Sequence, residues 1–408
     1  MEIEKLKKSN TKRYIIIGSI VVLILAGITL TFTKAKYKTT TSIPLVNGTI
    51  NYDLSDLNLI GVYIQEGEEY KQTNEIPTSG YEFNSEESYC TINNERDDTI
   101  TLNFDMTTQN LTVTPLTKKG TKCYLYFDEK ASAGDTILAA SKPQGQTTDW
   151  INKGQGVTYY YTGANPNNWV QFGEFWWRII RINGDGSIRM IYQGTSANTT
   201  GTGTQIGTSA FNSSDNRSYY VGLVHDGSGQ HGYGQPSTIM TTLNNWYNSN
   251  LASYEEDYID TGAGFCSDRN LQSGSWSASG SHNYAAYGRL YNKGSESASL
   301  QCSDVDILSQ DNGRLPNPIG LVTADEAALA GVTWNNPKSS YLNTGQYYWT
   351  LSPFYFYYGY AHVFVVNVNG NLVNSRVNYA RGVRPVINLK SAITITGEGS
   401  VDKPFKIQ

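Results

Sequence analysis

The chain has 408 residues, of which 39% are hydrophobic and 16% charged, and its formal net charge is −5 at pH 7. This length predicts two or three domains, and the composition excludes a chain that is disordered over most of its length. The negative balance and the scarcity of lysine beyond the N-terminus exclude a broad basic surface, so we expect no nucleic-acid partner.

An apolar run without charges, Tyr14–Phe32, follows a basic N-terminus. Its nineteen residues match the thickness of a bilayer core, and the excess of basic residues before it favours a cytoplasmic N-terminus. We therefore expect residues 1–38 to form a cytoplasmic tip and a transmembrane helix. The bulk of the chain would lie outside the cell, as in a single-pass membrane protein. A cleaved signal peptide is the alternative.

The four cysteines fall into two local pairs, Cys90 with Cys123 and Cys266 with Cys302. Outside the cell these pairs would form disulfides, whereas four reduced buried thiols are the alternative. None of the four Cys or four His has CxxC or HxxxH spacing. We therefore expect no metal site and no cofactor.

Residues 39–140 contain short runs in which apolar and polar residues alternate, such as Ile100, Leu102 and Phe104. Alternation with a period of two predicts strands, and the intervening Gly and Asn residues predict turns. This stretch is expected to be a small β-sandwich. A polar connector over residues 141–156 marks the predicted boundary to a larger domain, residues 157–408.

The larger domain is predicted to be α+β. A hairpin is expected from Trp176–Ile182 and Ser187–Gln193, followed by long loops around a strand at Tyr219–Val224. Capping and amphipathic patterns predict two helices, Ser237–Leu251 and Thr323–Ala330. The last expected strands are Tyr347–Leu351, His362–Asn367, Leu372–Asn378 and Val383–Leu389.

Seven aromatic rings lie between Phe354 and Phe364. Alternation assigns Phe364, Val366, Val368, Val373, Val377 and Val383 to the core. The same alternation assigns asparagines and Arg376 to the opposite, polar face. His362 shares the parity of Val366, so its outward placement would need a bulge or a strand end. Tyr and Asn side chains together are typical of protein-binding surfaces.

A second feature of this segment is what it lacks. Lys, Glu, Gln, Met and Trp make up 64 of the 408 residues, yet none occurs from Phe354 to Leu389. These are the five residue types that a codon ending in C or T cannot encode. Substitution at the first two bases of adenine-rich AAC or AAT codons could never produce these five residue types, and so would explain their absence. Chance or ordinary strand composition is the alternative explanation.

Five stretches carry a resemblance to a known group: FGEFWWRIIRINGDGSIRMIYQG, TTLNNWYNSNLASY, NPIGLVTADEAALAG, YYWTLSP and GVRPVINL. In this order they resemble the C-type-lectin-like domains of bacterial surface proteins whose C-terminal segment is varied by diversity-generating retroelements. GVRPVINL alone would also fit the wider set of formylglycine-generating-enzyme-like lectin folds. The resemblance covers Thr158 to Leu389.

The resemblance implies a scaffold that presents varied side chains to a protein or glycan ligand outside the cell, without catalysis. The implied frame is Trp349, Ser352, Pro353, Gly370, Gly382, Val383, Arg384 and Pro385. The implied ligand-binding face is Tyr355, Tyr357, Tyr358, Tyr360, His362, Asn367, Asn369, Asn371, Asn374, Arg376, Asn378, Tyr379 and Arg381.

Other functions are weighed against this one. A calcium-dependent lectin lacks its acidic motif, since only Gln235-Pro236-Ser237 comes near. A formylglycine-generating-type oxidase would need reactive thiolates. A hydrolase could use Ser352, His362 and Asp325, although no GxSxG turn is present. A structural role in cell-wall attachment or self-association is the remaining alternative.

Overall fold

The computed structural model describes residues 57–77, 80–106, 108–115, 120–148, 156–197, 199–294, 297–334 and 339–408. These residues divide into two compact units. The first contains residues 57–77 and 83–128, and the second contains residues 80–82 and 129–408.

The first unit is built from strands that form one five-stranded sheet, in the order β2-β1-β7-β3-β4, and a two-stranded pair, β5-β6. The strands are β1 (Leu57–Glu66), β2 (Glu69–Thr73), β3 (Tyr81–Ile92), β4 (Glu95–Arg96), β5 (Thr101–Asp105), β6 (Asn110–Thr114) and β7 (Thr121–Glu129).

The core of the first unit joins the strand pair to the sheet. The ring of Phe104 on β5 lies 5.3 Å from that of Phe127 on β7 and 6.0 Å from that of Phe83 on β3. Cys90 on β3 and Cys123 on β7 form a disulfide between adjacent strands. The predicted pairing of these two cysteines is confirmed.

The first part of the second unit, up to residue 258, contains short strands and helices. Its elements are α2 (Ala133–Ala140), β8 (Gly145–Thr148), β9 (Val157–Tyr160), β10 (Trp169–Phe172), β11 (Phe175–Ile182), β12 (Ile188–Gly194), η2 (Gly201–Thr204), β13 (Thr208–Ala210), η3 (Ser218–Val221), β14 (Val224–His225), β15 (Gln235–Pro236), α3 (Thr238–Asn250), η4 (Ala252–Tyr254) and α4 (Glu255–Tyr258).

The chain continues with β16 (Phe265–Cys266), β17 (His282–Asn283), η5 (Tyr287–Asn292), η7 (Asp304–Asp306), β18 (Ile307–Leu308), α5 (Ala324–Leu329) and β19 (Thr333–Trp334). The last strands are β20 (Tyr348–Tyr357), β21 (Tyr360–Val366), β22 (Asn371–Arg376), β23 (Ala380–Gly382), β24 (Val386–Leu389), β25 (Ile395–Thr396) and β26 (Phe405–Ile407).

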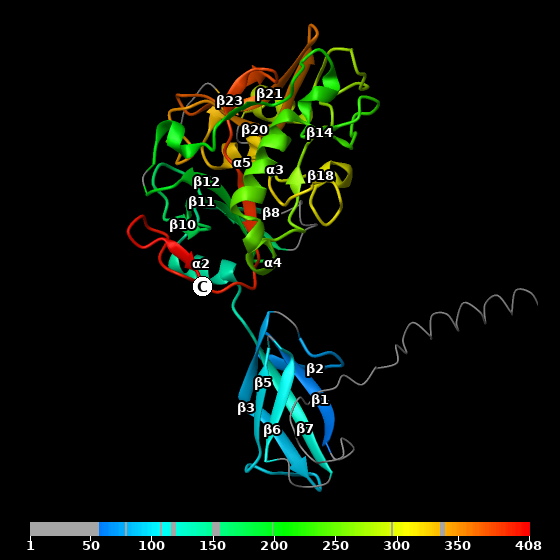
Figure 1. Ribbon diagram of the computed structural model, residues 1–408, viewed down its shortest axis with the longest axis vertical. Helices are drawn as coiled ribbons and strands as arrows, with labels where there is room; N and C mark the ends of the chain where they lie inside the picture. The colour runs from blue at the N-terminus through cyan, green and yellow to red at the C-terminus, as the bar shows by residue number, and fades with distance from the viewer. Residues whose placement is uncertain are drawn as a thin grey trace, which may run out of the picture. The chain divides into compact units, whose positions relative to one another are not determined.

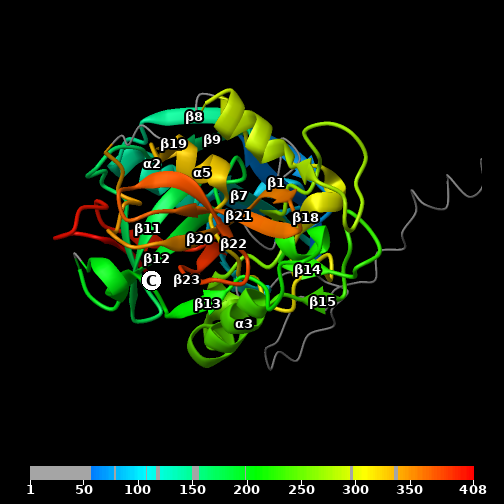
Figure 2. The same ribbon diagram turned by 90° about the horizontal axis from the view of Figure 1, so that it is seen from above.

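Two sheets organise the second unit. One runs β24-β12-β11-β10-β26-β25, with β8 and β9 attached at β11. The other runs β13-β23-β20-β21-β22-β19, with β17 pairing with β20. Strands β20, β21 and β23 lie side by side in Figure 1, and the view from above shows α3 beside β13 and β23 (Figure 2).

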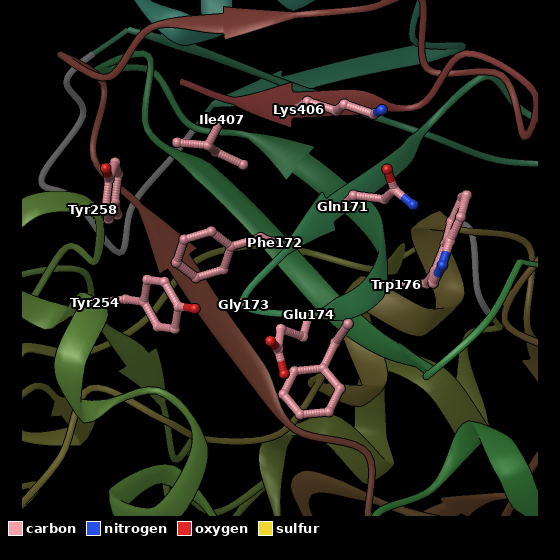
Figure 3. Close-up of a pocket in the computed structure, with 10 residues that line it drawn as sticks. Gln171, Phe172, Gly173, Glu174, Trp176, Tyr254, Tyr258, Lys406 and Ile407 are labelled. Carbon is pink, nitrogen blue, oxygen red and sulfur yellow. The ribbon is translucent and has the colours of Figure 1, made fainter.

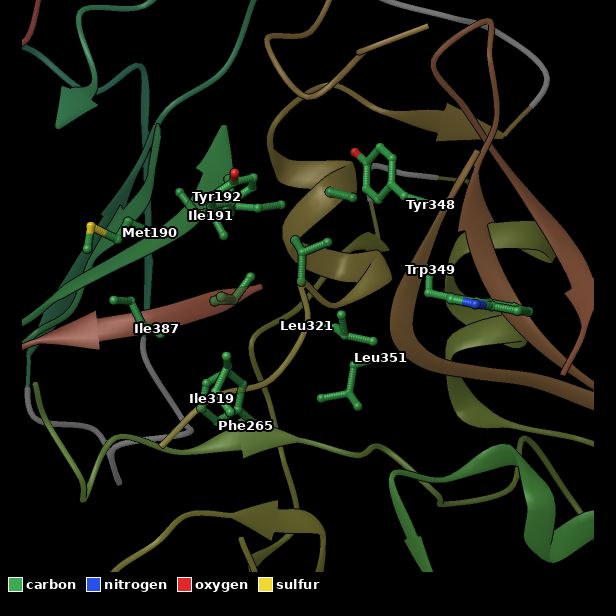
Figure 4. Packing of buried hydrophobic residues seen from close by; sticks show 14 of the residues in the cluster. Met190, Ile191, Tyr192, Phe265, Ile319, Leu321, Tyr348, Trp349, Leu351 and Ile387 are labelled. Carbon is green, nitrogen blue, oxygen red and sulfur yellow. The ribbon is translucent and has the colours of Figure 1, made fainter. Parts of the chain in front are cut away.

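The core of the second unit fills the space between these sheets. Ile191 on β12 and Ile387 on β24 face it from one side, and Leu351 on β20 faces it from the other (Figure 4). Leu321 lies between them, and all four side chains are buried. Burial of each aliphatic side chain contributes about 1.5–3 kcal/mol, so this layer fixes the two sheets against each other.

Both predicted helices are confirmed, because local capping signals determine where they begin. The Ser237 hydroxyl accepts a hydrogen bond from the Met240 N–H at the start of α3. Thr323 and Glu326 form the predicted capping box at the start of α5. The predicted hairpin is present as β11 and β12, and Cys266 and Cys302 form the second predicted disulfide.

The predicted α+β class is wrong. The structure is mostly β, since 38% of the residues that it describes lie in strands and 17% in helices. The expectation gave too much weight to two well-capped helices of the second unit, α3 and α5, and too little to short strands. Pairs as brief as β16 and β18 carry almost no alternation that a sequence pattern could reveal.

The predicted transmembrane helix, Tyr14–Phe32, lies outside the described residues, and no helix within them is long and apolar enough to cross a membrane. The predicted connector, residues 141–156, does not separate the two units. The division falls after residue 128, and Gly145–Thr148 forms strand β8 of the second unit. The strand expected at Tyr219–Val224 is wrong, since η3 occupies its first half and strand β14 begins only at Val224.

Candidate functional site

The turn between β20 and β21 carries the most exposed aromatic ring of the predicted face, Tyr358. Tyr357 and Tyr360 pair across it, so Tyr358 and Gly359 form a two-residue turn. Their φ angles are 48° and 80°. Gly adopts this left-handed conformation freely, but for another residue it costs roughly 1–2 kcal/mol. The hairpin twist favours this turn, but tyrosine is a disfavoured residue at its first position.

Cross-strand register brings side chains from three strands to one face of the sheet. Tyr355 on β20 is paired with His362 on β21, and His362 is paired with Arg376 on β22. Alternation adds the neighbours two residues away. We call the resulting group the tip surface: Tyr355, Tyr357, Tyr358, Tyr360, His362, Asn374 and Arg376.

The rings of the tip surface contact one another while remaining accessible to solvent. Tyr358 is 78% exposed, and the rings of Tyr357 and Tyr358 are 4.2 Å apart between centroids. The Arg376 guanidinium lies 3.3 Å from the centre of the Tyr360 ring. A cation over an aromatic face orients both groups, so Tyr360 and Arg376 form a pre-arranged pair.

His362 is half-buried behind these rings. Its Nδ1 lies 2.8 Å from the Asn374 Oδ1. Because an amide oxygen only accepts hydrogen bonds, Nδ1 donates and the Nε2 of the neutral ring is an acceptor. Burial lowers the pKa of His362, and the nearby Arg376 lowers it further, although the Asn374 hydrogen bond opposes this shift. The ring is therefore neutral at pH 7.

Two tyrosine hydroxyls of the tip surface keep their protons at pH 7. Burial raises the pKa of Tyr355, and a hydrogen bond with the neighbouring Tyr358 raises the pKa of Tyr357. Both hydroxyls can therefore donate and accept hydrogen bonds. The arrangement offers apolar ring area, neutral hydrogen-bonding groups and one cation.

Sequence analysis missed three rings that extend the tip surface. Tyr287 and Tyr291 lie on η5, which contacts β20, and Trp334 lies on β19, which pairs with β22. The Tyr287 ring is 6.4 Å from that of Tyr355, and the Tyr291 ring is 4.6 Å from that of Trp334. Tyr291 is 42% exposed. The spacing of Tyr287 and Tyr291 by four residues was the available signal, since it places both on one side of a helical turn.

The residues expected to form the frame are buried. The Trp349 Nε1 donates to the Ser209 carbonyl oxygen at 2.8 Å, and the Ser352 hydroxyl accepts from the Ala324 N–H at 2.9 Å. The other members are likewise inaccessible: Pro353, Gly370, Gly382, Val383, Arg384 and Pro385. This frame holds β20 against the core and so fixes the position of the tip surface.

Arg384 shows how tightly the frame is tied to the first sheet. It is fully buried and donates to the Tyr192 carbonyl oxygen at 3.1 Å and to the Gln193 Oε1 at 2.8 Å. Its guanidinium also lies 4.8 Å from the centre of the Tyr348 ring. Burial lowers the pKa of Arg384, while Tyr348 opposes the shift.

Three predicted ligand-binding asparagines lie at the other end of β21 and β22. Residues 367–370 form a turn there, so the strand predicted over His362–Asn367 ends one residue earlier, at Val366. The Asn367 Oδ1 accepts from the N–H groups of Asn369 at 2.9 Å and Asn371 at 3.0 Å, so this amide holds the turn. The expectation that Val368 is core is wrong, because the turn leaves it 44% exposed.

The last three predicted residues form a separate patch. Asn378 and Tyr379 are exposed after β22, and Arg381 lies within 5.7 Å of the Tyr379 ring centre. The Arg381 Nε donates to the Ser375 hydroxyl at 3.1 Å. Ser375 alternates with Asn374 and Arg376, so this patch contacts the opposite face of β22.

The residues of the hypothetical hydrolase each have another partner. The Ser352 hydroxyl caps α5, Asp325 accepts from the Arg289 guanidinium at 2.8 Å, and His362 bonds Asn374. Cys266 and Cys302 are oxidised to a disulfide and so offer no thiolate. Within the residues that the structure describes, no group of three or more His, Cys, Asp or Glu is arranged to hold a metal ion.

Residues 304–391 match a protein family described as a domain of unknown function (DUF6273). The match begins at η7 and ends after β24, so it includes the frame and the tip surface. No curated protein and no solved structure matches the chain.

Proposed function

We propose that the second unit is a binding module that holds a protein or glycan ligand outside the cell on the tip surface, without chemical conversion. A protein ligand is favoured, because Tyr side chains supply rigid ring area together with a polar hydroxyl. Arg376 and the neutral His362 add orientation through charge and hydrogen bonding. Anchors of this kind dominate the affinity of protein interfaces.

The observation that carries the proposal is the conformation of Tyr358. A large ring is 78% exposed at a turn position where its left-handed backbone is strained. Strain of this kind persists where surrounding structure enforces it and clusters at ligand-binding sites. Burial of the ring against a partner would compensate the cost that the free protein carries.

The two disulfides support a location outside the cell, because such bonds persist in oxidising compartments and are rare in the cytosol. The ring cluster of the tip surface supports interaction with a partner, because large exposed apolar groups in a contiguous patch mark binding sites.

The absence of Lys, Glu, Gln, Met and Trp from Phe354 to Leu389 supports diversification of this segment by a retroelement. The tip surface lies entirely within the segment, whereas Tyr287, Tyr291 and Trp334 lie outside it. Sequencing of the flanking DNA tests the point. An adenine-rich near-copy of the 3′ end of the gene supports diversification, and flanking DNA without such a copy or a reverse transcriptase gene rejects it.

The binding proposal is tested with the full chain on arrays of surface proteins and glycans. The variant carries Tyr357→Ala, Tyr358→Ala and Tyr360→Ala, each expected to cost about 1–4 kcal/mol of binding free energy if it is an anchor. Tyr233→Ala is the matched control, since Tyr233 is 38% exposed and bonds the Val305 carbonyl oxygen elsewhere in the unit.

Ligands that the triple variant loses and the Tyr233→Ala control retains support the proposal. Equal binding by both variants rejects it. If the chain instead associates with itself, sedimentation will show a larger species that only the triple variant dissolves, and the structural alternative is then correct.

A further inference from the structure

The hollow beside Glu174 on the second unit does not form a single site (Figure 3). Gln171 on β10 pairs with Trp176 on β11 and with Lys406 on β26, so these side chains lie on one face of the sheet. Phe172 lies on the other face, where its ring contacts those of the η4–α4 segment. Strand backbone separates the two groups. Buried polar groups elsewhere in the unit indicate a ligand more strongly.

Arg269 is a buried cation without a counter-charge in contact with it. Its side chain belongs to a residue that is 2% exposed. Its Nη1 donates to the carbonyl oxygens of Tyr219 at 3.4 Å and Val224 at 3.3 Å. Its Nε and Nη2 are buried and have no hydrogen-bond partner within the described part of the chain. Because a guanidinium stays protonated in proteins, burying one without an anion is costly.

The carboxylates of the surrounding loops, Asp226 and Asp306, are bound elsewhere. The Asp226 Oδ1 accepts from the backbone N–H groups of Ser228 at 2.8 Å and Gly229 at 3.1 Å. Asp306 accepts hydrogen bonds from four side chains: His231, Ser267, Asn270 and Ser303. Neither carboxylate bonds Arg269, so neither neutralises its charge by direct contact.

A second buried arginine, Arg384, is satisfied by the protein alone. Its Nε and Nη2 donate to the Tyr192 carbonyl oxygen, and its Nη1 donates to the Leu342 carbonyl oxygen. All three nitrogens therefore have partners, whereas Arg269 uses one of its three. The difference indicates that Nε and Nη2 of Arg269 bind a group that the described chain does not supply.

Two more unpartnered nitrogens lie near Arg269. Burial raises the pKa of Tyr284, while Arg269 and Trp276 oppose the shift because their N–H groups lie close to its hydroxyl. The Trp276 Nε1 is buried and has no partner among the described residues. The same holds for the Nδ1 of His225, which follows Val224 in the chain. Burial lowers the pKa of His225 and the nearby Arg269 lowers it further, so the neutral ring can donate through Nδ1.

We propose that the unpartnered N–H groups of Arg269 and Trp276 bind a halide ion such as chloride. A halide is a spherical acceptor, so it can bond N–H groups that lie in different planes, and its charge compensates that of Arg269. Arg269 already bonds η3, and η3 contacts β20 and β21. The ion therefore stabilises the scaffold behind the tip surface, and the inference does not depend on the ligand proposed for that surface.

Two other occupants fit these groups less well. A water molecule could accept hydrogen bonds, but it would leave the charge of Arg269 uncompensated and would need acceptors for its own hydrogens. A phosphate or carboxylate carried by a larger ligand would have to reach the site from solvent, whereas Nε, Nη2 and the Trp276 Nε1 are all buried.

The test follows thermal unfolding of the full chain while sodium chloride replaces sodium methanesulfonate at constant ionic strength. The unfolding temperature should rise saturably with chloride, because an ion that binds only the folded state stabilises it. Arg269→Met should abolish this rise. Arg217→Met is the matched control and should retain it, since Arg217 is exposed at the start of η3. Trp276→Phe removes one donor and should weaken chloride binding about tenfold.

Crystals of the unaltered chain soaked in bromide give a direct readout, because bromine scatters anomalously. An anomalous peak beside the Trp276 Nε1 and the Arg269 Nε or Nη2 supports the inference. An ordered water without anomalous signal at this place overturns it. It is also overturned if chloride stabilises Arg269→Met as much as Arg217→Met. If Arg269→Met does not fold, the presence or absence of the bromide peak decides.

Discussion

The two ends of β21 and β22 differ in how their turns use side chains. At one end, Asn367 bonds the backbone of its own turn and Gly370 supplies the positive φ of 77°. At the other end, a tyrosine occupies the strained position and directs its ring to solvent. The first turn follows local folding preferences, and the second departs from them. This contrast supports the proposal that the Tyr358 end contacts a partner.

The same face of the sheet changes from exposed to buried between these ends. Tyr360 and His362 are followed on β21 by Phe364, which is fully buried. The Trp334 ring lies 6.3 Å from Phe364, and Phe354 stacks on Trp334 at 5.5 Å. The rings of β19 and η5 that cover this face do not reach the turn between β20 and β21. The buried scaffold and the exposed tip surface are therefore two ends of the same pair of strands.

The largest expected effect is a loss of stability in the scaffold that leaves ligand binding by the tip surface unchanged. Glu326 is buried between Arg181 and Arg189, whose side-chain Nε atoms lie 3.1 and 2.5 Å from its Oε1. Although burial alone would raise the pKa of Glu326, the two guanidinium groups hold it below its usual range. Removing the carboxylate leaves two buried cations without their counter-charge, so Glu326→Ala should cost about 3–5 kcal/mol of unfolding free energy.

Urea denaturation measures this loss, and Glu398→Ala is the exposed control, since its ion pair with Lys403 is worth little. The protein that remains folded should bind its ligand with unchanged affinity. A loss of stability equal to that of the control would show that the buried charges do not hold α5 against β11 and β12.

A smaller effect of opposite sign is expected at the strained turn. Asn is well tolerated at positive φ, so Tyr358→Asn should stabilise the fold by about 1 kcal/mol and weaken ligand binding. Thermal unfolding and the binding assay measure the two quantities on one variant. If the substitution destabilises the protein, the Tyr358 ring contributes to folding and not to a contact surface.

The turn at residues 367–370 should respond in the opposite way, with a loss of stability and no change in ligand affinity. Asn367→Ala removes the acceptor for two backbone N–H groups and should cost about 1 kcal/mol of stability. Ligand affinity should not change, although Asn367 is among the residues that the sequence assigned to the ligand-binding face. A marked loss of affinity with unchanged stability would return this turn to the binding site.

The smallest effect is a pH dependence. Because the pKa of His362 is lowered from 6.5 in the folded state, folding favours the neutral ring. Its contribution to stability is complete above pH 6.5 and is lost as the pH falls through the folded-state value. His362→Gln should flatten the acid side of the stability profile relative to the unaltered chain, and an unchanged profile would show that the ring does not titrate in this range.

The sequence could predict elements whose signals are local. Such signals predicted the helix caps at Ser237 and Thr323, the turn at Asn183–Gly186 and both disulfides. The exposure of Tyr357, Tyr358 and Tyr360 was expected, but their contact with Arg376 depends on register between β21 and β22. Register is a tertiary property that alternation alone does not define.

Other features of the candidate site depend on segments far apart in the chain. Alternation treated Asn367 and Asn369 as strand residues because it could not detect the turn, and it could not place Tyr287 or Trp334 beside Tyr355 and Phe354. The residues that surround Glu174 come from three segments between residue 171 and residue 407. No pattern within a single segment predicts that these segments lie close together.

The central claim is that the rings of the tip surface face solvent in the free protein. Brief tyrosine iodination of the full chain, with mass spectrometry of the peptides, measures this directly. We expect Tyr358 and Tyr360 to be modified well before the buried Tyr284 and Tyr348. Modification of Tyr358 at the slow rate of Tyr348 would contradict the account.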